Sequence, residues 1–169
     1  AVWVVQDDGV IPTAIDYYET SNEGAADIIA ACMPETFIAP PYAEKFRGWS
    51  RVAALKELGR EKPFQYGAHF FPHDISVREW GAGGRSRVEM VMELGLRSVR
   101  RGVAAGPAER INAVRAILPK MRFHMGPGIE LGLKRLRRYR RKWNDSLQSY
   151  TTPQHDENSH GADAFGEYA

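Results

Sequence analysis

The sequence has little cysteine and no long apolar run, and both absences limit the classes of protein to which it can belong. Cys32 is the only cysteine among 169 residues, so the chain cannot form a disulfide framework or a Cys-x-x-Cys zinc site. No stretch approaches the roughly 18 consecutive apolar residues that a membrane-spanning helix needs. No basic, apolar leader opens the sequence, and we therefore expect a cytoplasmic protein with no membrane partner.

The sequence also lacks a nucleotide-binding loop and a marked excess of either charge. The glycine-rich segment Trp80–Arg87 has no Gly-Lys-Ser/Thr ending, so it is not a P-loop. Lys and Arg number 23 against 21 Asp and Glu, so the net charge of +2 does not by itself predict a nucleic-acid partner. The length and the hydrophobic fraction of 43% are typical of one globular domain, which we expect to span residues 1–169.

Short apolar runs and helical periodicities alternate along the sequence, and their order predicts an α/β fold with a mixed β-sheet flanked by helices. The expected strands are residues 1–6 and 10–18, joined as a hairpin by the turn Asp7-Asp8-Gly9, and residues 66–71 and 97–103. The expected helices are residues 25–33, 51–58, 88–94, 107–118, 129–143 and a last one capped by Ser159. Residues 37–49 and 151–160 are expected to be loops.

Two segments concentrate side chains that can bind a metal ion. Asp74 ends the run Pro72-His73-Asp74 after an expected strand, and Asp163 lies in the last helix beside small residues that would let this helix approach the sheet. Carboxylates suit Mg²⁺ or Mn²⁺, and two such ions can activate water and stabilise the leaving oxygen of a phosphodiester. We predict Asp74, Asp163 and His160 as catalytic residues, the two aspartates as metal ligands, and His73, His155 and Asp156 as their supporting neighbours.

Each of these residues also has an ordinary structural interpretation. Asp74 can form a turn, Asp163 can complement a helix dipole, and the histidines can be hydrogen-bonded structural groups. Ser159, His160 and Asp163 lie too close in sequence for a hydrolase triad and lack a nucleophile elbow. Glu19 lies at the end of the second expected strand, where its carboxylate is either a further metal ligand or simply exposed to solvent.

Positive charge gathers locally although the total is balanced. Between Lys134 and Lys142 the sequence has seven Lys and Arg and no acid, and Arg85 and Arg87 lie in the glycine-rich loop. Cations on such surfaces bind phosphates by releasing counterions, whereas the alternative is a solvated charged face. The residues predicted to hold DNA are Arg85, Arg87, Lys134, Arg135, Arg137, Arg138, Arg141 and Lys142.

Several segments taken together resemble the carboxy-terminal nuclease domain of phage terminase large subunits. They are Ala1–Gln6, Ile15–Glu19 (IDYYE), Tyr66–Asp74 (YGAHFFPHD), Arg85–Leu96, Leu133–Trp143 (LKRLRRYRRKW) and His155–Phe165 (HDENSHGADAF). The resemblance runs in order across almost the whole chain. Its most specific part is Pro-His-Asp followed far downstream by Ser-His-Gly-Ala-Asp-Ala.

The resemblance implies a ribonuclease H-like fold in which acidic residues bind two Mg²⁺ or Mn²⁺ ions and cut concatemeric viral DNA during packaging. Asp74 and Asp163 match two of the family's three acids. The third belongs in the family to a first strand that precedes Ala1–Gln6, and we expect this strand and the ATPase domain to be absent from the chain. Glu167 stands where relatives commonly carry a basic residue. The implied partners are double-stranded DNA, the terminase ATPase domain, the small terminase subunit and the portal, in the host cytoplasm.

Two other interpretations stay open at this point. One is a catalytically inactive module that grips DNA or docks on the packaging motor, which would not need clustered acids to bind divalent ions. The other is a different ribonuclease H-like nuclease, such as a junction resolvase, which would prefer branched DNA.

Overall fold

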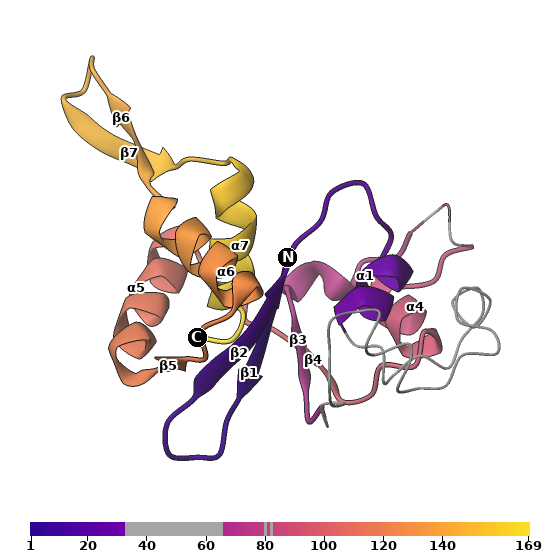
Figure 1. Ribbon diagram of the computed structural model, residues 1–169. Coiled ribbons are helices and arrows are strands. Elements are labelled where there is room, and N and C mark those ends of the chain that lie inside the picture. The colour runs from indigo at the N-terminus through magenta and orange to yellow at the C-terminus, as the bar shows by residue number, and fades with distance from the viewer. Residues whose placement is uncertain (33–65, 80, 82) are drawn as a thin grey trace. The chain divides into compact units, whose positions relative to one another are not determined.

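A computed structural model describes residues 1–32, 66–79, 81 and 83–169, and these residues form a mixed α/β structure (Figure 1). The described part contains five α-helices and three small sheets, so the predicted α/β class is confirmed. The chain divides into two compact units: unit 1 is Ala1–Glu19 with Val103–Ala169, and unit 2 is Thr20–Gly102. The loop and helix expected at residues 37–49 and 51–58 lie outside the described residues.

Unit 1 is built on a three-stranded sheet in the order β1-β2-β5. Strand β1 (Val2–Gln6) pairs antiparallel with β2 (Thr13–Tyr18), which confirms the predicted hairpin. Strand β5 (Arg122–Phe123) pairs parallel with β2 and was not predicted, because two residues carry no period. At the hairpin loop the carboxylate of Asp8 accepts a hydrogen bond from the backbone N–H of Val10 at 2.9 Å.

Two helices, α6 (Pro127–Arg138) and α7 (Glu157–Gly166), pack on this sheet, and a third, α5 (Pro107–Ile117), packs on α7. A proline opens both α5 and α6, where its missing N–H costs no hydrogen bond. Trp3 occupies the centre of the core, with its ring centroid 4.6 Å from that of Tyr17 and 5.0 Å from that of Phe165. The core therefore joins β1, β2 and α7, and the buried Ile129 adds α6 to it.

Glycines let the two last helices lie close to the strands. A Cβ on Gly161 of α7 would stand 2.7 Å from the hydroxyl of Tyr17 and 2.9 Å from Cβ of Arg135. The carbonyl of the same glycine accepts a hydrogen bond from the indole N–H of Trp3 at 2.9 Å. The prediction that small residues bring this helix against the sheet is therefore confirmed for β1 and β2 of unit 1.

The predicted helix over residues 129–143 is too long. Helix α6 ends at Arg138, and the chain turns into a two-stranded antiparallel ribbon of β6 (Arg141–Asn144) and β7 (Ser149–Pro153). Tyr139 already has an extended backbone, with ψ of 121°. The loop expected over residues 151–160 is wrong at both ends, since β7 covers its first three residues and the last helix, Glu157–Gly166, covers its last four. Helical periodicity continued past Arg138, but pairing of Arg141–Asn144 with the strand that follows four residues later prevailed.

The cap of the last helix is also different from the prediction. Asp156 is the N-cap of α7, and its carboxylate accepts hydrogen bonds from the backbone N–H groups of Asn158 at 2.8 Å and Ser159 at 3.3 Å. Ser159 lies within the helix. Aspartate and serine are about equally good N-caps, so the helix could begin after either Asp156 or Ser159, and it begins after Asp156.

Unit 2 contains the parallel pair β3 (His69–Phe71) and β4 (Val99–Arg101) and the helices α1 (Ala25–Cys32) and α4 (Arg87–Glu93). Both strands are shorter than predicted, whereas the two helices lie where they were expected. A single 3-10 turn, η2 (His73–Ser76), follows β3, so Asp74 lies just after a strand as predicted. Ser86 and Glu89 cap the start of α4 reciprocally.

Gly161→Ala should destabilise unit 1. Alanine favours a helix over glycine by up to about 1 kcal/mol, but the added methyl would press on Tyr17 and Arg135, and overpacking costs about 1–3 kcal/mol. We expect a net loss of about 1 kcal/mol in denaturant unfolding. Gly67→Ala is the control because a Cβ there meets nothing within 4 Å. Unchanged unfolding of Gly161→Ala would show that close approach does not hold α7.

Candidate functional site

The start of α7 brings together three of the predicted site residues, His155, Asp156 and His160. The rings of His155 and His160 lie 5.3 Å apart, and Nδ1 of His155 lies 3.2 Å from the hydroxyl of Ser159. Both histidines are exposed to solvent. Asp156 caps the helix. Burial raises the pKa of its carboxyl group, but the hydrogen bonds from Asn158 and Ser159 have the larger combined effect, so the pKa is lowered. The two histidines are therefore accessible, whereas Asp156 has a structural task.

Asp163 lies one helical turn after His160, with 43% of its side chain exposed. Its nearest cation is Arg110 of α5, whose Nη1 atom lies 4.0 Å from Oδ1. The same guanidinium lies 3.3 Å from Glu167, which is buried. Sequence reasoning missed Arg110, because α5 is far from α7 in sequence and only the packed helices bring it near. The pair with Asp163 is longer than a hydrogen bond, so this carboxylate stays accessible.

Asp74 belongs to unit 2 and has a closer partner. Nη1 of Arg87 lies 2.7 Å from its Oδ2, and Nε of the same arginine lies 2.6 Å from Glu79. These side chains are all about half exposed. The pKa of Arg87 is raised, mainly by its hydrogen bond to Glu79 and also by the negative charges of Glu79 and Asp74. A predicted DNA-binding residue thus pairs with a predicted metal ligand. His73 lies beside Asp74 in η2 and is exposed.

Arg85, the other predicted cation of this unit, is also paired. Its Nη1 atom lies 2.6 Å from Glu93 of α4. The glycine-rich segment therefore carries arginines that meet acids of their own unit, and a DNA phosphate would have to compete with those acids. Exposed pairs of this kind contribute about 1 kcal/mol or less, so such competition is feasible.

No group of three or more His, Cys, Asp and Glu side chains suited to a metal ion occurs within the part of the chain that the structure describes. Asp74 and Asp163 lie in different units, and each shares an arginine with one glutamate, Asp74 with Glu79 and Asp163 with Glu167. Asp163 fits a hydrated divalent ion best, since it offers oxygen ligands to solvent and its arginine is 4.0 Å away.

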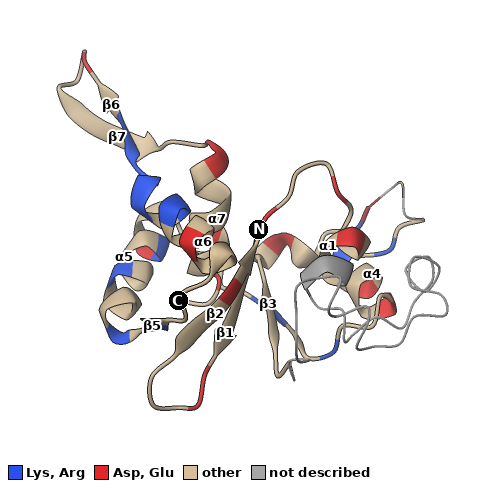
Figure 2. Cartoon of the chain, in the orientation of Figure 1, with Lys and Arg blue, Asp and Glu red and all other residues tan. Residues whose placement is uncertain are grey.

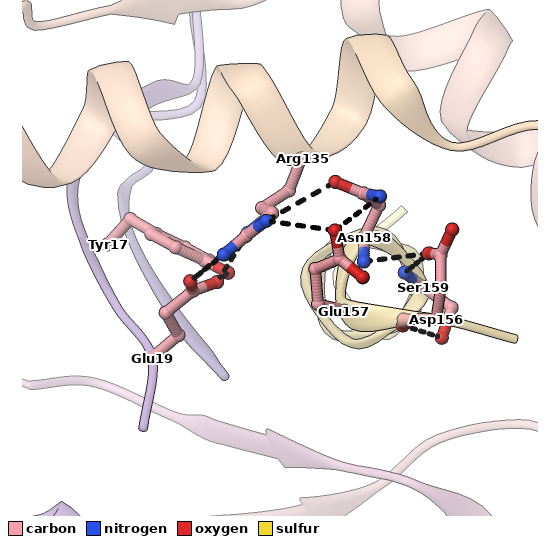
Figure 3. Close-up of polar contacts among 7 residues, drawn as sticks. All are labelled: Tyr17, Glu19, Arg135, Asp156, Glu157, Asn158 and Ser159. Carbon is pink, nitrogen blue, oxygen red and sulfur yellow. Dashed lines mark hydrogen bonds and ion pairs between the residues drawn. The ribbon is translucent and has the colours of Figure 1, made fainter. Parts of the chain in front are cut away.

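The most connected polar group of unit 1 is Arg135 of α6. Figure 3 shows its guanidinium between Glu19, just after β2, and the first turn of α7. Nε of Arg135 donates to both carboxylate oxygens of Glu19, at 3.0 and 3.1 Å, and Nη1 donates to Asn158 at 3.4 Å. The hydroxyl of Tyr17 donates to Glu19 from the other side. One arginine thus links the sheet to both helices.

This network assigns a structural role to two residues whose predicted roles were different. Hydrogen bonds from Arg135 lower the pKa of Glu19, against the effect of burial, and Tyr17 adds to the lowering. Glu19 is therefore an ion-pair partner in this structure. Arg135 has only 16% of its side chain exposed, so it points inward and differs from the other cations of its helix.

The remaining cations of this segment lie on the outside of unit 1. They form a surface over the last turns of α6 and the start of β6, which we call the basic surface (Figure 2). All of its members are exposed, and none forms an ion pair with a residue that the structure describes. The basic surface consists of Lys134, Arg137, Arg138, Arg140, Arg141 and Lys142.

The helices in the described ranges are all too short or too polar to cross a membrane. Comparison of the chain with protein-family models, with curated proteins and with solved structures found no match.

Glu19→Gln should destabilise unit 1 and change its acid response. A hydrogen bond to a charged partner contributes about 1.5–3 kcal/mol, and we expect a loss of that size at neutral pH. Because the folded pKa of Glu19 lies below its ordinary 4.5, its stabilisation is present above pH 4.5 and is lost as the pH falls through the folded value. The gap between parent and variant, measured by denaturant unfolding, should therefore close in acid.

Glu130→Gln is the matched control, since Glu130 is an exposed carboxylate on the same helix as Arg135. It should change the stability by about 0.5 kcal/mol or less. A gap between parent and Glu19→Gln that is as large in acid as at neutral pH would contradict the assigned ion pair.

Proposed function

We propose that this protein is a divalent-metal-dependent DNA endonuclease, the ribonuclease H-like nuclease part of a phage DNA-packaging terminase. The observation that carries the proposal is made within unit 1. Its last helix offers an accessible carboxylate and an exposed histidine, and a second exposed histidine directly precedes the cap of this helix. The neighbouring α6 carries a basic surface that has no acidic partner among the described residues. An acid for a metal ion and cations for a phosphate backbone thus belong to one compact unit.

The basic surface is the proposed grip on DNA. Six cations within nine residues would each release counterions on contact with phosphates, which favours binding without regard to sequence. The surface is divided between a helix end and a β-ribbon, so its cations extend beyond the length of α6. Arg135 is left out of this set because its guanidinium is held by Glu19. Arg85 and Arg87 of unit 2 are proposed as weaker additional contacts.

Asp163 is the proposed metal ligand of unit 1, with Asp74 as the second acid that the sequence resemblance supplies. A bound Mg²⁺ or Mn²⁺ ion would supply an activated water and positive charge for the leaving oxygen. His160, one turn from Asp163 and exposed, is placed to accept or donate a proton at its ring nitrogen. At Asp74 a metal ion would have to displace Arg87, which an exposed ion pair permits at small cost.

The second candidate is a DNA-binding or motor-docking module without nuclease activity. It is favoured by one specific observation: both candidate metal ligands face an arginine of their own unit. In such a module these acids would serve only as partners of Arg87 and Arg110. Such a module would still bind double-stranded DNA. The sequence resemblance also implies the ATPase domain, the small terminase subunit and the portal as its protein partners.

Asp163→Asn should weaken Mn²⁺ binding by at least about tenfold in calorimetric titration, because it replaces a negatively charged carboxylate ligand with a neutral amide. Mn²⁺-dependent nicking of plasmid DNA by the same samples should fall with it, and Asp74→Asn should act in the same direction. Glu130→Gln removes an exposed carboxylate of unit 1 in the first turn of α6, away from the basic surface, and should change neither. Metal binding that survives Asp163→Asn unchanged would exclude the assigned ligand, and DNA binding without any Mn²⁺ binding would favour the docking module.

The double variant Arg138→Ala/Lys142→Ala should bind duplex DNA more weakly and with less salt dependence. Each lost phosphate contact lowers the slope of log affinity against log salt by about 0.9, so we expect a change approaching about 2. Lys120→Ala, a cation of unit 1 outside the basic surface, is the control. An unchanged slope in the double variant would show that DNA binds elsewhere.

A further inference from the structure

The β6–β7 ribbon carries a feature that the proposed chemistry does not use. It extends away from α6 and α7 in Figure 1, and two large aromatic side chains on it are exposed, Trp143 to 49% and Tyr150 to 65%. They are cross-strand partners, with ring centroids 5.0 Å apart and planes at 72°. Exposed aromatic pairs leave apolar surface in water, and an isolated two-stranded ribbon is marginally stable.

From this placement we infer that the ribbon enters a groove of duplex DNA and sets Trp143 and Tyr150 against the bases. The inference rests on the proposed function, because it concerns the same DNA that the basic surface would hold. It adds a contact to the bases where the basic surface contacts only the backbone. The ribbon thus becomes the element that reads or locally distorts the duplex near the point of cleavage.

The positive charges beside the aromatic pair favour DNA as the partner that the ribbon contacts. Arg141 and Lys142 precede Trp143 directly on β6, and Arg140 precedes β6 itself, so three cations adjoin the aromatic pair. Asp145 in the ribbon turn is the one acid nearby, and it accepts a hydrogen bond from the indole N–H of Trp143 at 3.0 Å. This contact fixes the indole. The negative charge of Asp145 in the turn also indicates that the basic end of the ribbon, and not its turn, meets the phosphates.

The dimensions agree with this assignment. Two paired strands lie about 4.8 Å apart, and with their side chains they fit the major groove, which is about 12 Å wide and accepts a two-stranded ribbon. Thr151 and Thr152 provide β-branched residues opposite the basic strand, and the hydroxyl of Thr151 donates to the carbonyl of Lys142 at 3.3 Å. The ribbon therefore has its own internal support while it presents the aromatic pair.

The test replaces both aromatics by valine, which keeps apolar character and strand propensity but removes the rings. Duplex affinity of the full chain is measured by fluorescence anisotropy at several salt concentrations, and far-UV circular dichroism checks the fold. We expect Trp143→Val/Tyr150→Val to bind about tenfold more weakly at every salt concentration with an unchanged salt slope, since apolar contacts with base edges release no counterions. Leu147→Ala, an exposed apolar residue of the ribbon turn, should bind as the parent does.

Four results would overturn the inference. Equal affinity of parent and double variant would show that the aromatic pair does not touch DNA, while leaving the proposed nuclease intact. An equal loss in Leu147→Ala would show an unspecific effect on the ribbon. A shift of self-association in sedimentation, with DNA affinity unchanged, would assign the pair to a protein contact. A parent chain that binds no duplex at all would remove both this inference and the proposed function.

Discussion

The ion pair between Arg135 and Glu19 is the interaction on which the arrangement of unit 1 depends. Glu19 follows the central strand, Arg135 belongs to α6, and Asn158 lets the same guanidinium reach α7. Both charged side chains are mostly buried, so either one without the other would leave an uncompensated charge. Gly161 makes this geometry possible by letting α7 approach Tyr17 and Arg135. The direction in which Asp163 and His160 leave α7 follows from that approach.

The same short segment of chain thus serves two purposes. Within Leu133–Trp143 the inward arginine orders the helices, while the outward cations have no acidic partner in the described part of the chain and can meet an anionic ligand. Arginine suits the inward role because its planar fork binds a carboxylate through two atoms. The change from helix to ribbon after Arg138 then spreads the outward cations along a longer path and brings Trp143 beside them.

Local signals in the sequence predicted local structure well. The hairpin of β1 and β2, the helices α1, α4 and α5 and the close approach of α7 all follow from turn residues, caps and small side chains. The ribbon of β6 and β7 was missed because strand pairing depends on residues outside the helical window. The inward role of Arg135 had a usable signal, since it lies three residues after the buried Gly132 and therefore close to the same helix face. Arg110 and the pair of Asp74 with Arg87 had none, because each depends on how separate elements pack. Whether Asp74 and Asp163 share one metal site stays a prediction of the sequence resemblance.

The central claim is that α7 binds a divalent ion while the neighbouring basic surface binds DNA. Its most direct test is backbone amide NMR of the isotopically labelled chain, titrated first with Mg²⁺ and then with a DNA duplex. The account predicts Mg²⁺-dependent shifts centred on Asp163 and His160, and separate DNA-dependent shifts centred on residues 134–143. Mg²⁺ shifts that leave α7 untouched, or DNA shifts that avoid the basic surface, would contradict it.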